Sequence, residues 1–298
     1  MNDALGLREE RSTLQSRAVA ASAYWRPSIP RFALSVLLGS GVLCLAGVAG
    51  APGSARSESL LGLAVNAVAV LHYWFILKIR SNPSGRTHVD EFYVDELRHS
   101  DWACTLFFLY LHFHAAAARL GAPRPPLFSG LVGALLQPLL VLLGALGRFL
   151  SDELRARHWR RWVGAAAYLL SCAVFGIAIY NLLSCLLRVP ESTAHELRAG
   201  DSARLLTGLA LTQLGYPLLA LLQICWRAWA GSEPLTHERL PLMGWGVSGG
   251  ASLKTTGSLR APAPASYPEW LSVTKDVGYA LLDVTVKGGV ALYSGLLG

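Results

Sequence analysis

Residues 270–297 read WLSVTKDVGYALLDVTVKGGVALYSGLL, a largely apolar run that is long enough to cross a lipid bilayer as one helix. Within this run, Asp283 and Lys287 are four residues apart and therefore share one face of the helix. Ionisable residues are costly inside a membrane, and those that occur there usually carry function. A lysine amine kept away from water can form a Schiff base with an aldehyde, and the buried cation then needs a carboxylate. The run therefore predicts both a membrane helix and a chemical site.

The rest of the 298-residue chain has the same character, with 53% hydrophobic and 15% charged residues. Soluble domains carry about 25% charged residues, so this composition excludes a soluble globular protein. The net charge of +7 could suggest nucleic-acid binding, but the arginines lie between apolar runs, as they do in the loops of membrane proteins. We therefore expect a lipid bilayer, and no nucleic acid, as the partner. The five cysteines are interpreted as small buried hydrophobic residues.

Apolar segments of about 20 residues predict an all-α membrane protein, a bundle of seven transmembrane helices. The segments are roughly Phe32–Gly50, Leu60–Ile79, Leu97–Ala118, Leu127–Leu150, Trp162–Leu187, Ala203–Trp226 and Trp270–Leu297. A polar N-terminal segment, 1–31, precedes the seven-helix domain, 32–298. A long loop rich in Gly, Pro and Ser, at about 227–269, precedes the last helix. An odd number of spans places the two termini on opposite sides of the membrane.

The third predicted span contains several polar residues on one stripe. Arg98 and Asp101 are one turn apart, as are Asp101 and Thr105, and His112 lies about 16 Å beyond Asp101 along the helix. Asp101 and Asp283 are the only acidic residues well inside the predicted spans. One buried cation facing two carboxylates, with an arginine nearby, would be close to a neutral cluster.

At this point the chain resembles the microbial (type 1) rhodopsins, seven-helix proteins that hold retinal in the bundle interior. The resemblance extends over about residues 32–298. The matching blocks are His72-Tyr73, Arg98-His99-Ser100-Asp101-Trp102 through Thr105, Tyr216-Pro217 and Leu282-Asp283-Val284-Thr285-Val286-Lys287. His72 resembles the histidine of the proteorhodopsin and xanthorhodopsin branches, which pairs with the acceptor aspartate.

The resemblance implies all-trans retinal bound covalently to Lys287 as a protonated Schiff base. It implies that Asp101 is the primary counterion and proton acceptor, tuned by His72, and that Asp283 is a second counterion. Arg98 would gate the release side, and Thr105 would hydrogen-bond Asp101. The residues expected to line the polyene are Trp102, Tyr73, Tyr216 and Pro217. Leu109 occupies a position whose leucine implies green absorption.

Several positions depart from the family pattern. His112 stands where outward proton pumps have a carboxylic proton donor, and it is interpreted either as a donor near neutral pH or as neutral packing. Gln213 and Ala220 replace two tryptophans, so the pocket is less aromatic. Gln213 could hydrogen-bond near the chromophore or to another helix. Lys275 and Asp276 replace an acidic release-group pattern.

The leading hypothesis is a light-driven ion transporter, with protons as the ion, rather than an enzyme. Asp101 disfavours chloride transport because a fixed carboxylate competes with the anion. A sensory photoreceptor with a slow photocycle is the second hypothesis, because His112 replaces the carboxylic donor. A light-gated channel is the third, and Leu106 at the position of a gating cysteine weakens it. No metal-ligand cluster is predicted, and the resemblance suggests homo-oligomers such as trimers or pentamers.

The direction of transport depends on which side of the membrane holds the N-terminus. The family usually places it outside the cell. Lys and Arg residues, however, number 17 on the N-terminal side and 6 on the other, and positive charge favours the cytoplasm. The two alternatives are the family orientation with atypical loops and an inverted protein that moves protons inward.

Overall fold

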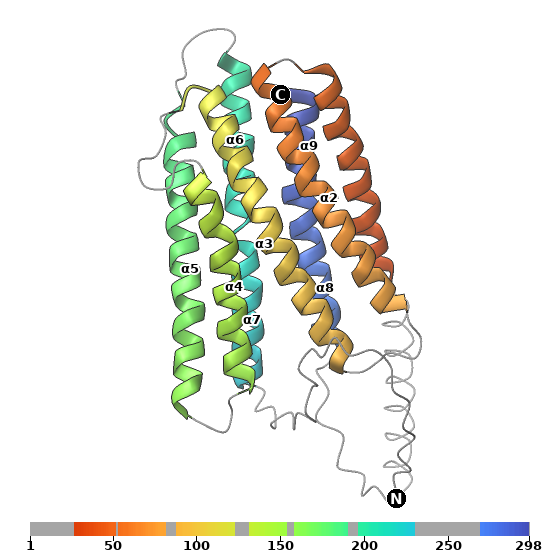
Figure 1. Ribbon diagram of the computed structural model, residues 1–298, viewed down its shortest axis with the longest axis vertical. Helices are drawn as coiled ribbons and strands as arrows, with labels where there is room; N and C mark the ends of the chain where they lie inside the picture. Colours follow the sequence, from red (N-terminus) through yellow and green to blue (C-terminus); the bar gives the residue numbers. More distant parts are fainter. Residues whose placement is uncertain are drawn as a thin grey trace, which may run out of the picture.

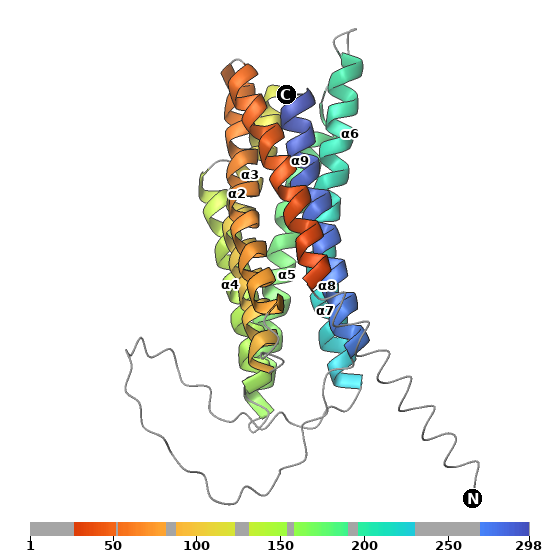
Figure 2. The ribbon, with the colours of Figure 1, turned by 90° about the vertical axis from the view of Figure 1, so that its right-hand side faces the viewer.

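A computed structural model of the protein describes residues 27–51, 53–81, 88–122, 131–153, 158–189, 196–229 and 269–297. These residues form a bundle of long helices with no strand among them (Figure 1, Figure 2). The elements are a first helix, Pro27–Gly50, followed by α2 Gly53–Ser81, α3 His88–Arg119, α4 Leu131–Glu153, α5 His158–Leu186, α6 Glu196–Thr212, α7 Gly215–Trp229, α8 Glu269–Asp283 and α9 Gly289–Leu292. The bundle confirms the predicted fold class.

Two of the continuous rods in the bundle consist of two helices each: α6 with α7, and α8 with α9. The chain turns briefly at Gln213 and Leu214 between α6 and α7. Pro217 lies three residues after Leu214, and it has no backbone N–H to donate to the turn before it. Between α8 and α9 lies a π-helical turn, Val284–Gly288, and a second one, Tyr293–Leu297, follows α9. The described helices therefore form seven rods, the number predicted from the sequence.

Many large apolar side chains face outwards from the bundle, whereas ionisable side chains of the helices lie inside it, unlike in a soluble protein. Val132 and Leu222 are 75% and 65% exposed, whereas Asp101 and Lys287 are each 1% exposed. Four of the described helices are long and apolar enough to cross a membrane by length and composition. Such helices satisfy their own backbone groups in lipid, and the ionisable side chains face the bundle interior. The protein is an integral membrane protein.

The predicted start of the second span needs correction. The second span was expected to begin at Leu60, but α2 begins at Gly53 and includes Glu58, which is fully buried. Asp101 and Asp283 are therefore not the only acidic residues well inside the helices. The polar segment 1–31 and the loop 227–269 lie almost entirely outside the described residues.

The two ends of the bundle serve as reference points below. The N-terminal end is where the first helix begins and α2 ends, at the lower end of Figure 1. The C-terminal end is where the last described residues lie, beside the start of α2 (Figure 1). The first helix and α9 thus carry the described ends of the chain to opposite ends of the bundle.

Candidate functional site

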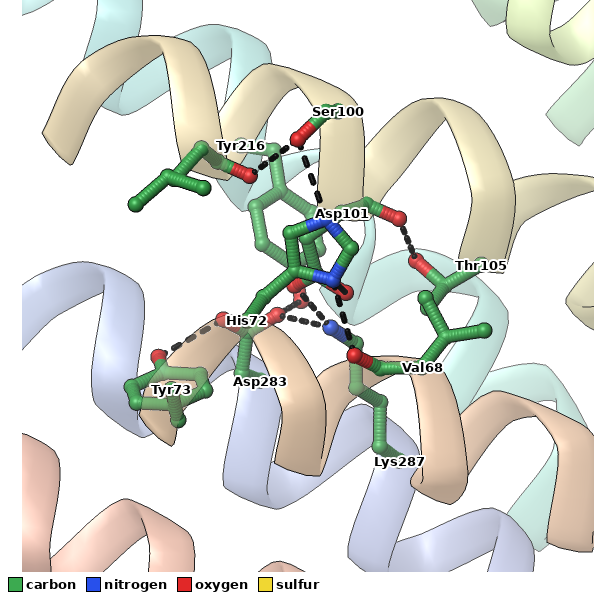
Figure 3. Close-up of polar contacts among 10 residues, drawn as sticks. Val68, His72, Tyr73, Ser100, Asp101, Thr105, Tyr216, Asp283 and Lys287 are labelled. Atoms are coloured by element: carbon green, nitrogen blue, oxygen red, sulfur yellow. Dashed lines mark hydrogen bonds and ion pairs between the residues drawn. The ribbon is translucent and has the colours of Figure 1, made fainter. Parts of the chain in front are cut away.

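A buried ion cluster lies in the middle of the bundle, where α3 faces the last rod (Figure 3). Nζ of Lys287 is 2.5 Å from Oδ2 of Asp101 and 3.0 Å from Oδ1 of Asp283. All three side chains are at most 2% exposed. The structure therefore brings together the lysine and the two carboxylates that the sequence singled out, from α3, α8 and the π turn.

The carboxylate of Asp283 is held on both oxygens by tyrosines from two other helices. The hydroxyl of Tyr73, on α2, donates to Oδ2 at 2.7 Å, and the hydroxyl of Tyr216, on α7, donates to Oδ1 at 2.7 Å. Hydrogen bonds to a carboxylate stabilise its charged form. Asp283 is therefore held in position beside Lys287 by two other helices.

Asp101 is bound differently, because only one of its oxygens has a hydrogen bond. Oδ2 accepts from Lys287, while Oδ1 has no hydrogen-bond partner within the described part of the chain. An oxygen with a spare lone pair can take a proton without first losing a bond. The two carboxylates next to Lys287 are chemically unequal, and Asp101 is the one suited to accept a proton.

His72 lies next to Asp101 without bonding to its carboxylate. One ring nitrogen, Nδ1, is 2.8 Å from the carbonyl oxygen of Val68, and Nε2 is 3.0 Å from Oγ of Ser100 (Figure 3). Nδ1 is 4.0 Å from Oδ1 of Asp101, which is beyond hydrogen-bond length. His72 can therefore influence Asp101 through its charge, and Val68 and Ser100 hold the ring in place.

Thr105 hydrogen-bonds Asp101, as expected, but it does so through the backbone of that residue. Its hydroxyl donates to the backbone carbonyl oxygen of Asp101 at 2.7 Å, which is the usual bond of a helical threonine to the preceding turn. The carboxylate of Asp101 receives nothing from it. Thr105 thus shapes the helix at Asp101 and leaves Oδ1 free.

Arg98 belongs to a second ion cluster, between Asp101 and the N-terminal end of the bundle. Its Nη2 lies 2.7 Å from Oδ1 of Asp276, whose other oxygen is 2.8 Å from Nη2 of Arg80. Lys275 and Asp95 form a further pair at 2.7 Å. The sequence placed Arg98 here but missed Asp95, because Asp95 precedes the predicted third span.

The aromatic residues of the site pack around Trp102. Its ring centroid is 4.9 Å from that of Tyr216 and also 4.9 Å from that of Tyr279, which the sequence did not single out. Leu109 is 2% exposed and lies in the main hydrophobic core. The carbonyl oxygen of Pro217 accepts from the hydroxyl of Tyr168 at 2.8 Å.

A small pocket lies between α3, α4, α5 and the turn that follows α6. Its lining residues are Leu106, Tyr110, Phe113, Gln137, Ala178, Ile179, Leu182 and Gln213. Leu106 follows Thr105 directly, and Gln213 takes a place where the resemblance expects a tryptophan. A buried amine with two carboxylates can form a cation with an aldehyde and hold a counterion beside it.

His112 lies apart from the central cluster, towards the C-terminal end. It is fully buried, its Nε2 is 3.4 Å from Oγ of Ser294, and Nδ1 has no hydrogen-bond partner among the residues described. His112 thus has one ring nitrogen near a hydroxyl and one without a hydrogen-bond partner in the part of the chain that the structure describes.

Fold and site together define a seven-helix membrane protein with an internal lysine. A family model described as bacteriorhodopsin-like protein matches residues 32–234, and the chain belongs to that family. The cofactor of the family is retinal, attached to a lysine. No protein with a curated description matches the chain.

Solved structures of microbial rhodopsins share the fold. The chain is 14% identical to xanthorhodopsin, a light-driven ion pump with dual chromophore, with a TM-score of 0.56 and 93% of each chain covered. It is 16% identical to Exiguobacterium sibiricum rhodopsin, with a TM-score of 0.59 and coverage of 94% of this chain and 96% of that one. Thermophilic rhodopsin gives 14% identity, a TM-score of 0.56 and 93% coverage of each chain.

Proposed function

We propose that the protein is a light-driven proton pump in which retinal is attached to Lys287 and Asp101 accepts the proton. The inequality of the two carboxylates carries this proposal. Asp283 has both oxygens filled by tyrosine hydroxyls, whereas Asp101 contacts the same amine and keeps one oxygen without a hydrogen bond. When bound, retinal supplies light absorption and a change of shape at the lysine nitrogen.

The protein's own groups then move the proton in one direction along the bundle. The proton on the Lys287 nitrogen passes to Asp101, the carboxylate that keeps one oxygen without a hydrogen bond among the described residues. The Asp95–Arg98–Asp276 cluster lies on the N-terminal side of Asp101, so release is towards the N-terminal end. The Lys287 nitrogen regains a proton from the C-terminal end of the bundle, and the buried His112 on that side is the candidate carrier.

Light-dependent pH and current measurements test the proposal. Cells or vesicles that contain the protein and all-trans retinal should change the external pH under light, and an uncoupler should abolish the change. A steady current at zero voltage supports a pump, whereas a current that reverses with the ion gradient indicates a channel. Colour without any current indicates a sensor. The matched variant Asp101→Asn should keep retinal and lose the pH change.

A further inference from the structure

Glu58 is a buried acid that the pumping mechanism described above does not use. It lies on α2 near the C-terminal end of the bundle, and none of its surface is exposed. Its Oε1 accepts a hydrogen bond from Nε of Arg119 at 2.7 Å. Its Oε2 has no hydrogen-bond partner among the residues that the structure describes. A half-satisfied carboxylate is costly in a membrane interior, so it calls for a reason other than stability.

Arg119 connects Glu58 both to the protein surface and to the last rod. The Arg119 side chain is 24% exposed, so the buried carboxylate is one side chain away from the surface. Nη2 of Arg119 donates to the hydroxyl of Tyr293 at 2.7 Å. The end of α3, the start of α2 and the second π turn therefore meet at this point (Figure 1).

The ring of Tyr293 also lies beside the ring of His112. The two ring centroids are 5.9 Å apart, and the next residue, Ser294, places its Oγ 3.4 Å from Nε2 of His112. Ser59, the neighbour of Glu58, donates to the carbonyl oxygen of Ser294 at 3.1 Å. Glu58 and His112 thus belong to one local network, and each has a spare polar atom.

The same face of α2 extends this network to the lysine. Asn66 lies eight residues after Glu58, about 12 Å along the helix. Its Nδ2 is 3.4 Å from the carbonyl oxygen of Lys287, and its Oδ1 has no partner within the described residues. Gly62, between them, leaves room for Ser294, whose Oγ is 3.3 Å from where a Cβ on Gly62 would lie.

We infer that Glu58 is the proton relay of the return path, taking protons at the C-terminal end and passing them to His112. The inference rests on the proposed proton pump and deepens it. Glu58 gives its carboxyl proton to one ring nitrogen of His112 as the other ring nitrogen releases its proton towards Lys287, so the imidazole stays neutral before and after the transfer. The carboxylate that remains is held by Arg119 and then takes a proton from water at the surface. The charge of Arg119 stabilises the anion for the interval between the two transfers.

A purely structural reading would make Glu58 and Arg119 a latch that closes the end of the bundle. Buried ion pairs are weak evidence for stability, and a latch has no need of a spare carboxylate oxygen. The two readings predict different results for removal of the acid and for removal of the cation. Glu58→Gln keeps the size and the acceptor for Arg119 but carries no exchangeable carboxyl proton, whereas Arg119→Gln breaks the latch and keeps the acid.

The experiment uses the full-length protein with all-trans retinal in lipid vesicles. After a light flash, wild-type protein should show an infrared change of a carboxylic C=O that is missing in Glu58→Gln. Recovery of the dark absorption should slow by about a hundredfold in Glu58→Gln, the usual contribution of a positioned acid. The weak acid azide, added to this variant, should restore much of the rate. Asp201→Asn, at an exposed acid paired with Arg204, is the matched control and should behave as wild type.

Two outcomes overturn the inference. One is an unchanged infrared band with wild-type recovery in Glu58→Gln, which leaves the pump itself intact. The other is a slowing in Arg119→Gln that equals the slowing in Glu58→Gln and that azide does not relieve, which identifies a latch. If Glu58→Gln fails to fold, Glu58→Asp is measured instead. A shift of the carboxylic infrared band in this variant supports the relay, and an unchanged band contradicts it. If wild-type protein moves no protons, the proposed function fails, while the infrared band still tests proton exchange at Glu58.

Discussion

Asp101 and Asp283 approach the same lysine nitrogen, yet only Asp283 has a tyrosine hydroxyl on each of its oxygens. The two aspartates come from α3 and α8. Among the described residues, this arrangement leaves an oxygen without a hydrogen bond on Asp101 and none on Asp283. The predictions below follow from this division and from the clusters around it.

The first prediction concerns the two aspartates. Asp101→Asn should abolish light-driven pH changes and move the absorption maximum to longer wavelength, because less negative charge then stabilises the cation in the dark. Asp283→Asn should leave a proton acceptor in place and impair pumping less. Absorption spectra and pH traces of both variants check this. Complete loss of proton transfer in Asp283→Asn, with transfer retained in Asp101→Asn, would reverse the assignment.

The second prediction concerns the attachment residue. Lys287→Ala should give a protein that forms no visible pigment with retinal, because no other amine lies between the two carboxylates in the described structure. Lys275→Ala is a matched control, since Lys275 is also a buried lysine but pairs with Asp95 instead. Absorption after retinal is added measures both. Colour that survives in Lys287→Ala would falsify the proposed attachment.

A third prediction concerns the tyrosines on Asp283. Tyr73→Phe and Tyr216→Phe each remove one hydrogen bond to a charged group, a loss of about 1.5–3 kcal/mol of stability. Both bonds go to one carboxylate, so the double variant should deviate from the sum of the single ones. Thermal loss of colour measures the effect. Strict additivity would argue that Asp283 is not a shared anchor.

A fourth prediction concerns the cluster at the N-terminal end. Asp276→Asn removes the charge that Arg80 and Arg98 share, and breaking a buried pair costs about 3–5 kcal/mol. We expect lower thermal stability and a delay between the colour change and the appearance of protons in bulk water, followed with a pH-indicator dye. Unchanged release timing, with stability alone reduced, would assign the cluster a structural role only.

A fifth prediction links membrane orientation to the direction of transport. Protons are proposed to leave at the N-terminal end of the bundle whichever way the protein is inserted. An N-terminus that is accessible outside intact cells should therefore accompany acidification of the medium, and a cytoplasmic one should accompany alkalinisation. Labelling of the termini and the sign of the pH change are measured on the same cells. An external N-terminus with alkalinisation contradicts the proposed path.

The sequence predicted the number of rods and the central cluster well, because both depend on local pattern. The length of an apolar run determines a span, and the four-residue spacing of Asp283 and Lys287 determines that they share a face. The pairing of Asp101 with Lys287 came from the family resemblance, since nothing local links α3 to the last rod.

Other features depend on tertiary contacts that no sequence pattern showed. Thr105 bonds to its own helix instead of a carboxylate, and His72 is held by Val68 and Ser100. Glu58 was missed because the apolar run that predicted the second span begins at Leu60, two residues after Glu58, whereas α2 itself begins at Gly53. Its significance depends on Arg119, which lies 61 residues further along the chain.

Because of the π-helical turn at Val284–Gly288, the geometry of the last rod depends on the number of residues in this turn. This turn contains Lys287 and begins directly after Asp283. A π turn holds one residue more than an α turn, so deleting one residue from it would restore regular helix while the segments on either side keep nearly the same orientation. A deletion between Asp283 and Lys287 would, however, reduce their spacing from four residues to three and move the amine along the helix axis relative to Asp101.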